Sequence, residues 1–476
     1  MHQLRLGFLG VSQLNFDTQL TVANYAAARQ WVQELAEGAG GALEALPASV
    51  VETKDAIEAL SRFAAAGVEL LLVQTTCFAS GEVASEIASY ASRYRIPVVL
   101  WGIPEPTGGA LRANSFCCQN FYTSILHARG VPFKWVWGAP GAEELTRQLE
   151  RTVTAVRALE QLRRTKVAVL GSGRVPGFYG SNFDELALKE RFGVSVSRID
   201  LSEVFRRAAA LGAAEAEAGV VELRDRTSIE GGVTDEALER VSRMHVALTS
   251  LAAEGDFDGL AIRCWPEYVD IYGTVVCANI GLLNDEGIVT SDEADLLGLV
   301  SMLCQRYVTQ EREVPTLLDW SYTDFEANAV GLWHCGATAC GLARAGTTPV
   351  SAMHSILGRA EGETPTGVVI EQLLRLGPAT VFRLCGAEGA RALCFTGEVV
   401  DSPMIFQGAY ASLKLDDLEA RDLVNTILVS GVEHHYSLCY TRHEDELDEL
   451  MYWLDVEPLE VVPYDEGRGA FARWEE

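Results

Sequence analysis

Short, continuously apolar segments recur along the first part of the chain, each separated from the next by a longer segment with helical character. Four of them cover residues 4–10, 67–74, 96–102 and 166–170. Strands of this kind are buried on both faces, which is typical of a parallel sheet covered by helices. After residue 315 the pattern changes to short strands with turns between them and few helices. An antiparallel sheet or small barrel is predicted there.

The length of the chain, 476 residues, allows two or three domains with substantial cores. We predict an α/β protein in which two parallel-sheet, Rossmann-like domains precede a mainly antiparallel, barrel-like β domain. The expected boundaries are residues 1–155 for the first domain, 156–312 for the second and 313–476 for the third.

The charge of the chain excludes several classes of partner. The formal net charge is −28 and the pI is near 4.7, so long-range attraction to nucleic acid or to an anionic membrane is not expected. No apolar run is long enough to span a bilayer, and the first ten residues resemble a strand rather than a leader. The eleven cysteines are scattered without a disulfide framework. A cytoplasmic location is therefore predicted.

Two acidic segments carry the strongest chemical signal. In the run T-S-D-E-A-D-L-L-G-L-V-S-M-L, which begins at Thr290, the carboxylates Asp292, Glu293 and Asp295 are expected to open a helix. In L-L-D-W-S-Y-T-D-F-E, Asp319 follows an apolar run and is expected at the end of a buried strand, where sites are often built.

Convergence of Glu293 and Asp319 would create an oxygen-rich seat for a divalent cation that still needs further ligands. The adjacent pair His434 and His435, in G-V-E-H-H-Y, is the obvious source of a further ligand. Side chains alternate along a strand, so only one of the two histidines is expected to face the cation, and we favour His435.

These three segments, in this order and spacing, resemble the metal-site segments of the L-fucose isomerase and L-arabinose isomerase superfamily. The resemblance covers mainly the second half of the chain. It implies aldose–ketose isomerisation of a monosaccharide or modified sugar through a cis-enediolate. It assigns Glu293 as ligand and acid/base, Asp319 as a carboxylate ligand with a catalytic role, and His435 as the histidine ligand.

The resemblance also implies a cofactor and an assembly state. Mn²⁺ is the expected ion, with Mg²⁺ or Co²⁺ as alternatives. A homo-oligomer is expected, commonly a hexamer in which the first domain of a neighbouring subunit helps to cover the active site. The aspartate at position 319 resembles the fucose branch, which leaves open whether His334 is a ligand, a pocket residue or a buried structural histidine.

Other residues are weaker candidates for contacts with the sugar. A glycine-rich loop, G-S-G-R-V-P-G, follows residue 170, but Pro176 fits a dinucleotide-binding helix start poorly. Arg174 and Arg263 are candidate partners for an anionic sugar. The residues expected to contact substrate are His334, Trp265, Trp320, Arg174, Tyr179 and His434.

Two other classes of function are compatible with the sequence. Cys77 and Cys264 both follow predicted buried strands, so a cofactor-independent racemase or isomerase that uses two thiols is one alternative. A non-catalytic sugar-binding protein is the other, because paired α/β domains often close on a sugar. The thiol mechanism leaves the late histidine pair and the third domain without a role.

Overall fold

The computed structural model describes residues 2–357, 366–467 and 469–471 of the chain. The chain divides into two compact units, Met1–Gln161 and Leu162–Glu476. Among the described residues, no helix combines the length and the apolar composition needed to cross a bilayer.

The first unit is built on a parallel sheet with the strand order β2-β1-β3-β4-β5. Leu9, Leu71 and Leu100 belong to a core shared with helices α2, α3 and α4. On the opposite face, Tyr25 of α1 stacks on Phe8 of β1 with ring centroids 5.3 Å apart. The elements are β1 (Arg5–Val11), α1 (Thr18–Gly38), β2 (Ala42–Ala45), α2 (Thr53–Ala66), β3 (Leu70–Thr75), α3 (Gly81–Tyr94), β4 (Val98–Gly102), α4 (Ser115–Ala128), β5 (Phe133–Trp137) and α5 (Glu143–Arg164).

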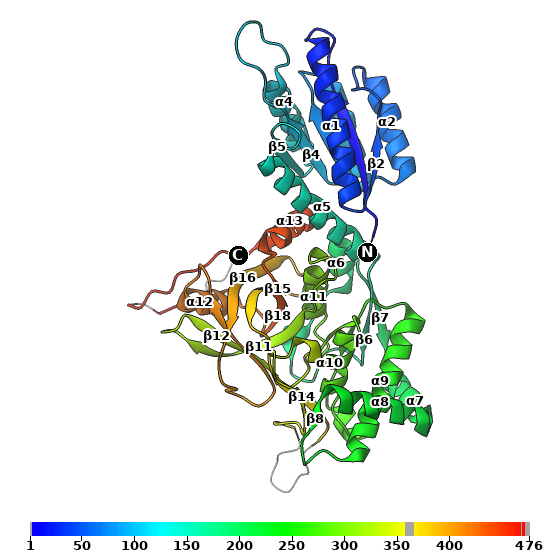
Figure 1. Cartoon of the computed structure of the whole chain (residues 1–476), viewed down its shortest axis with the longest axis vertical. Helices are drawn as coiled ribbons and strands as arrows, with labels where there is room; N and C mark the ends of the chain where they lie inside the picture. Colours follow the sequence, from blue (N-terminus) through cyan, green and yellow to red (C-terminus); the bar gives the residue numbers. More distant parts are fainter. Residues whose placement is uncertain (1, 358–365, 468, 472–476) are drawn as a thin grey trace. The chain divides into compact units, whose positions relative to one another are not determined.

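The second unit begins with another parallel sheet, in the order β10-β9-β6-β7. Helices α7, α8 and α9 lie together beside it (Figure 1). The elements are β6 (Lys166–Leu170), a 3-10 turn (Tyr179–Ser181), α6 (Glu185–Phe192), β7 (Ser195–Ile199), α7 (Leu201–Ala210), α8 (Ala213–Arg226), β8 (Ser228–Ile229), α9 (Asp235–Gly255), β9 (Gly259–Ile262), a π-helical turn (Tyr268–Tyr272), α10 (Cys277–Asp285), β10 (Val289–Ser291) and α11 (Leu296–Val308).

The remaining strands form a mainly antiparallel sheet in which β16-β15-β18-β11-β12-β17 closes into a barrel through the pairing of β17 with β16. Together with the two parallel sheets, this confirms the predicted fold class. The elements are β11 (Thr316–Asp324), β12 (Ala329–His334), a 3-10 turn (Cys340–Leu342), β13 (Val350–Ala352), β14 (Val369–Leu373), β15 (Gly377–Cys385), β16 (Arg391–Val400), β17 (Ala409–Leu415), α12 (Ala420–Ser430), β18 (His435–Tyr440), α13 (Glu444–Leu454) and β19 (Glu457–Pro458).

Helix α11 joins the parallel sheet to the barrel, and its length is almost wholly buried. Two of its buried polar side chains, Ser301 and Gln305, bond to barrel strands. The Leu384 N–H donates to Ser301 Oγ at 3.0 Å, and Gln305 Nε2 donates to the Thr380 carbonyl at 2.9 Å. Because buried polar groups need such partners, these bonds anchor α11 in one position against β15. The middle and second half of α11 are therefore held against the barrel.

Two local predictions about the acidic segments were wrong. Helix α11 begins at Leu296, because Glu293 and Ala294 have φ values of 57° and 54°, in the left-handed region that a right-handed helix excludes. Only Asp295 caps the helix, by accepting from the Gly298 N–H at 2.8 Å. Asp319 lies within β11 and not at its end. The residues after it continue the strand in pairing with β12, and Ser321 and Tyr322 among them are exposed.

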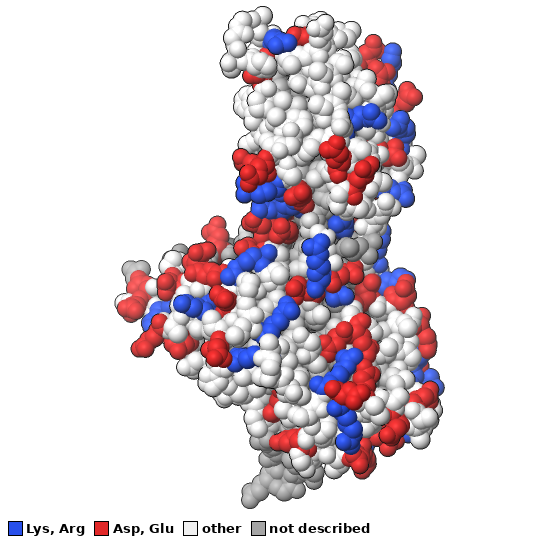
Figure 2. All heavy atoms as spheres, in the orientation of Figure 1, with Lys and Arg blue, Asp and Glu red and all other residues white. Residues whose placement is uncertain are grey.

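Acidic and basic side chains are interspersed on the visible face of the second unit (Figure 2). In the second unit, several charged side chains form surface ion pairs one helical turn apart, such as Arg240 with Glu236 and Arg243 with Glu239. Pairs of this kind contribute little to stability. No continuous basic surface is present on this face, in agreement with the strongly negative net charge.

Candidate metal centre

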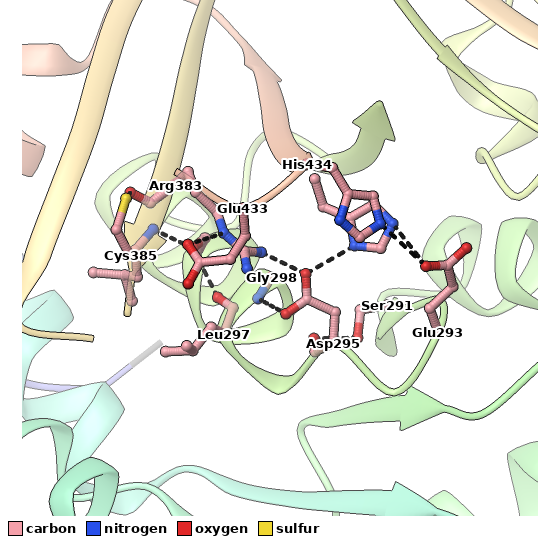
Figure 3. A network of polar contacts seen from close by, with 12 residues as sticks. Ser291, Glu293, Asp295, Leu297, Gly298, Arg383, Cys385, Glu433 and His434 are labelled. Atoms are coloured by element: carbon pink, nitrogen blue, oxygen red, sulfur yellow. Dashed lines mark hydrogen bonds and ion pairs between the residues drawn. The ribbon is translucent and has the colours of Figure 1, made fainter. Parts of the chain in front are cut away.

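The segment between β10 and α11 carries Glu293 in a tight turn. The Asp295 N–H donates to the Asp292 carbonyl at 3.0 Å, and the Ala294 N–H donates to the carbonyl of Ile262, at the end of β9. These bonds hold the left-handed residues in place, and the cost of that conformation is of order 1–3 kcal/mol. Strain of this kind is tolerated where it directs a side chain. Here the Glu293 carboxylate faces His434 (Figure 3) and also lies next to His435.

Barrel strands bring Asp319 and His435 together. Strands β11 and β18 are antiparallel, and Asp319 lies directly opposite His435 in their register. Directly opposed residues project from the same face of a sheet. His435 Nε2 lies 3.5 Å from Asp319 Oδ1 and 3.3 Å from Glu293 Oε2. Glu293, Asp319 and His435, which are far apart in the sequence, therefore converge.

The two adjacent histidines differ in their surroundings. The His435 side chain is 1% exposed and reaches both carboxylates. The His434 side chain is 47% exposed and lies 3.3 Å from Glu293 Oε2 through its Nε2. Strand β18 begins at His435, so His434 stands just outside the strand. Both histidines contact Glu293, but only His435 is enclosed and near Asp319.

His334 completes this cluster from the end of β12. Single donor atoms of Asp319, His334 and His435 all lie within 4.8 Å of one another. The ring of His334 is buried, with its centroid 5.8 Å from that of His435. The structure therefore places His334 beside the proposed ligands, whereas the sequence had left its position open.

A chain of buried charged groups begins at Nδ1 of His435. His435 Nδ1 donates to Asp295 Oδ2 at 2.9 Å, and Asp295 in turn forms an ion pair with Arg383. Arg383 Nε lies 3.9 Å from Glu433 Oε2, which extends the network to the residue before His434 (Figure 3). Because Nδ1 of His435 is used in this way, its Nε2 faces Glu293 and Asp319.

Local electrostatics set the ionisation of these groups. Burial alone would raise the pKa of Glu293, but the hydrogen bond to His434 and the adjacent imidazole of His435 outweigh it and lower the pKa to about 2. Burial alone would lower the pKa of His435, whereas its bond to Asp295 and the nearby Glu293 carboxylate raise it to about 9. The Arg383 charge overcomes the effect of burial on Asp295 and holds its pKa well below the ordinary value. Glu293 and Asp295 are thus carboxylates.

The donor atoms fit a divalent cation. Asp319 Oδ1, His334 Nε2 and His435 Nε2 are buried side-chain atoms that have no hydrogen-bond partner within the described part of the chain. Buried polar atoms are rarely left unpaired, so their convergence indicates an occupant. Carboxylate oxygens combined with imidazole nitrogens suit Mn²⁺, Co²⁺ or Mg²⁺ more than a soft metal. Glu293, Asp319 and His435 would hold it.

Of the two tryptophans expected to contact the substrate, one lies near the histidine pair and the other lies in the barrel. Phe178 packs edge-on against both Trp265 and His434, at centroid distances of 5.8 and 6.1 Å. This places Trp265 in the aromatic surroundings of the histidine pair. Trp320 does not join the cluster. It packs in the barrel against Phe395 and Tyr436, because it follows Asp319 on the strand and points to the other face.

Arg174 and Tyr179 belong to the loop after β6, which runs to the histidine pair. The guanidinium carbon of Arg174 lies 4.2 Å from the centre of the Tyr179 ring, and Tyr179 is exposed. At the next residue, a Cβ added to Gly180 would lie 3.6 Å from His434 Nδ1. This loop therefore borders the cluster on the side of His434.

The structure adds residues that were not expected from the sequence. Phe178 and Arg383 contact the site residues or support them, and so do Cys277, Cys335 and His354 through a second buried cluster. Arg383 left a recognisable signal, because it is a single charge within the apolar segment T-V-F-R-L-C. The other residues have no recognisable sequence signal, since their neighbours come from distant segments.

The two thiols of the alternative mechanism are poorly suited to proton transfer. Burial raises the pKa of Cys77 and raises that of Cys264 well above its ordinary value, where Asp292 and Glu293 add to the effect. A catalytic thiol requires a lowered pKa. Cys264 instead lies against the acidic segment as a buried neutral group.

Known proteins resemble this chain over most of its length. Residues 7–163 match the family model described as fucose/sulfoquinovose isomerase, N-terminal domain. The chain is 30% identical over 392 residues to a sulfoquinovose isomerase of Priestia aryabhattai, which covers 82% of this chain and 85% of that protein. It is 28% identical over 417 residues to one of Alkalicoccus urumqiensis, covering 87% of this chain and 91% of that protein.

Proposed function

This chain belongs to the fucose/sulfoquinovose isomerase family and is a sugar aldose–ketose isomerase, and we propose that its reaction depends on a divalent cation held by Glu293, Asp319 and His435. The observation that carries the proposal is the convergence of unpaired buried donor atoms from β11, β12 and β18 beside the Glu293 carboxylate. We propose Mn²⁺ as the ion.

A bound cation would stabilise the oxygens of an enediolate that forms as the sugar loses a carbon-bound proton. Glu293, which is ionised, takes the proton from C2 of the aldose and returns it to C1, while the proton of the C2 hydroxyl passes to the C1 oxygen, so that the C1 aldehyde becomes an alcohol and the C2 alcohol becomes a ketone. Asp319 and His435 would hold the cation in place beside Glu293. His434, which is exposed beside Glu293, contacts a sugar hydroxyl.

The substrate proposed is a sulfonated hexose. The relatives of Priestia aryabhattai and Alkalicoccus urumqiensis carry the name sulfoquinovose isomerase. A chain with a net charge of −28 repels an anionic sugar, so recognition requires a local cation.

Arg174 is the better of the two candidate arginines for this role. Arg263 forms an ion pair with Glu267 at 2.5 Å, which neutralises its charge, and also donates to the Ser172 hydroxyl at 2.7 Å. Arg174 donates to the Asn182 side chain at 2.9 Å and stacks over Tyr179. Within the described residues, no carboxylate lies in ion-pair distance of Arg174, so its charge remains available for a sulfonate.

The reaction is tested with a matched pair of sugars, sulfoquinovose and 6-deoxyglucose, which differ in the sulfonate. Mn²⁺-loaded protein is incubated with each sugar in D₂O and followed by NMR. We expect interconversion with deuterium entering at C1 or C2, and preference for the sulfonated sugar. A chelated protein that retains its full rate would contradict the metal proposal, and turnover without deuterium entry would contradict proton transfer through an enediolate.

We also propose that the enzyme is a cytoplasmic homo-oligomer, in which the first domain of a neighbouring subunit covers the active site. The proposal rests on family membership. Light scattering coupled to size-exclusion chromatography tests it, and a monomeric mass for the active protein would contradict it.

A further inference from the structure

A second buried cluster lies directly behind His334. Cys277 begins α10, Cys335 follows β12 and His354 follows β13, and single donor atoms of the three residues lie within 4.8 Å of one another. Cys277 and His354 are almost fully buried. Cys335 is the immediate neighbour of His334, so this cluster contacts the candidate metal centre through one residue.

The hydrogen bonds of His354 decide what this cluster can do. Two thiols and an imidazole have the donor types of a soft-metal site. However, His354 Nδ1 accepts the backbone N–H groups of Ile356 and Leu357, both at 3.0 Å. A neutral imidazole with an accepting Nδ1 carries its proton on Nε2. His354 therefore has no free lone pair for a metal and is a hydrogen-bond donor inside the cluster.

The sulfur of Cys335 accepts from His334. The thiol of Cys335 donates to the sulfur of Cys277 at 3.4 Å, and His334 Nδ1 lies 3.2 Å from Cys335 Sγ. The nearest carboxylate oxygen to this nitrogen, Asp292 Oδ2, is 3.9 Å away, beyond hydrogen-bond length. A sulfur accepts hydrogen bonds at such distances, so His334 donates its Nδ1–H to the sulfur of Cys335.

This bond has a consequence at the other ring nitrogen. With its proton on Nδ1, His334 has a lone pair on Nε2, the atom that has no partner among the described residues. That nitrogen belongs to the cluster formed with Asp319 and His435. The tautomer of a metal-binding histidine is normally set by the bond that its second nitrogen makes.

We propose that Cys335 is a positioning residue, whose sulfur accepts the Nδ1–H of His334 and thereby directs the Nε2 lone pair of His334 at the cation site. This role depends on the proposed metal-dependent function. Cys277 and His354 hold this sulfur in place. Cys277 accepts a hydrogen bond from the Cys335 thiol, and His354 is a hydrogen-bond donor within the cluster. His334 then adds a nitrogen to the set formed by Glu293, Asp319 and His435.

The test is the affinity of the whole protein for Mn²⁺ alone, measured after chelation by the electron paramagnetic resonance signal of the free ion. We expect Cys335→Ala to raise the dissociation constant about tenfold. Cys335→Ser, whose hydroxyl also accepts a hydrogen bond, should restore it to within about threefold of wild type. In a His334→Ala background, Cys335→Ala should have no further effect, because the two residues act through one bond.

Cys304→Ala is the matched control, since it removes a buried thiol from α11 away from the cluster and should leave the affinity unchanged. Melting curves of every variant establish that each is folded. A wild-type constant for Cys335→Ala overturns the role of Cys335 alone. Equal losses in the alanine and serine variants, or multiplying effects in the double variant, overturn it too. A wild-type protein that binds no Mn²⁺ overturns both this role and the proposed metal site.

Discussion

The Nδ1 of His435 donates a hydrogen bond to Asp295 Oδ2 at 2.9 Å, between two side chains that are each 1% exposed. Asp295 also caps α11 and forms an ion pair with the buried Arg383. One carboxylate therefore orients the proposed histidine ligand and neutralises a buried cation. The stability of the barrel and the geometry of the site depend on the same group.

We expect Asp295→Asn to weaken both properties. Asparagine still caps a helix, so the loss does not come from α11. It leaves Arg383 without its closest counter-charge, which costs about 3–5 kcal/mol of unfolding free energy. Activity should also fall about 10–100-fold as His435 loses its anionic partner. Urea unfolding and initial rates measure the two effects. Asp184→Asn, at the exposed start of α6, is the control, and an equal loss there would contradict the prediction.

Replacement of Glu293 by glutamine should separate binding from chemistry. The amide retains an oxygen for the cation but cannot accept the C2 proton, so the rate should fall about 10²–10⁴-fold. Exchange of the C2 hydrogen with D₂O, followed by NMR, should fall in parallel. Glu326→Gln, which alters an exposed carboxylate after β11, should change neither quantity. Retention of exchange in Glu293→Gln would assign the base to another residue.

The histidine pair should respond asymmetrically to substitution. His435→Asn removes the enclosed imidazole that contacts both carboxylates, so Mn²⁺ binding should be lost. His434→Asn removes an imidazole that is 47% exposed, so Mn²⁺ affinity should change little while KM for the sugar rises. Calorimetric Mn²⁺ titration and steady-state kinetics distinguish the two. The reverse pattern would make His434 the ligand.

His443 should make the protein less stable in acid. Burial lowers the pKa of His443 from an ordinary 6.5 to about 4, and Gln305 Nε2 donates to its Nε2 at 3.3 Å. Because the unfolded state binds the proton more tightly, this contribution is complete above pH 6.5 and is lost as the pH falls towards 4. The loss amounts to about 3 kcal/mol.

The measurement compares unfolding free energies of wild type and His443→Asn across this pH range. The wild-type protein should lose more stability than the variant on acidification, and the difference between the two curves isolates the contribution of His443. Parallel curves would show that the pKa of His443 is the same in the folded and the unfolded protein.

The order of strands and helices was largely predictable from the sequence. Continuous apolar runs such as Leu70–Thr75 identify strands buried on both faces, and the change of pattern after residue 315 identified the antiparallel barrel. The residue types and spacing of Glu293, Asp319 and the histidine pair also identified the family, which the similarity to known isomerases confirms.

The arrangement around those residues required the tertiary structure. The turn that carries Glu293 has left-handed backbone angles that no local sequence pattern predicted, and it is held by one bond to β9 and one within the turn. Enclosure in the barrel, opposite Asp319, distinguishes His435 from His434, and periodicity could only state that one of them faces inward.

The sequence by itself determined the elements and the chemical groups, because apolar periodicity and residue type are local properties of the chain. Only the tertiary structure decided which groups meet. Asp295 and Arg383 form an ion pair across 88 residues, and Cys335 meets Cys277 across 58. The free energy of such a contact depends on burial and on the surrounding donors and acceptors, which exist only once distant segments have packed.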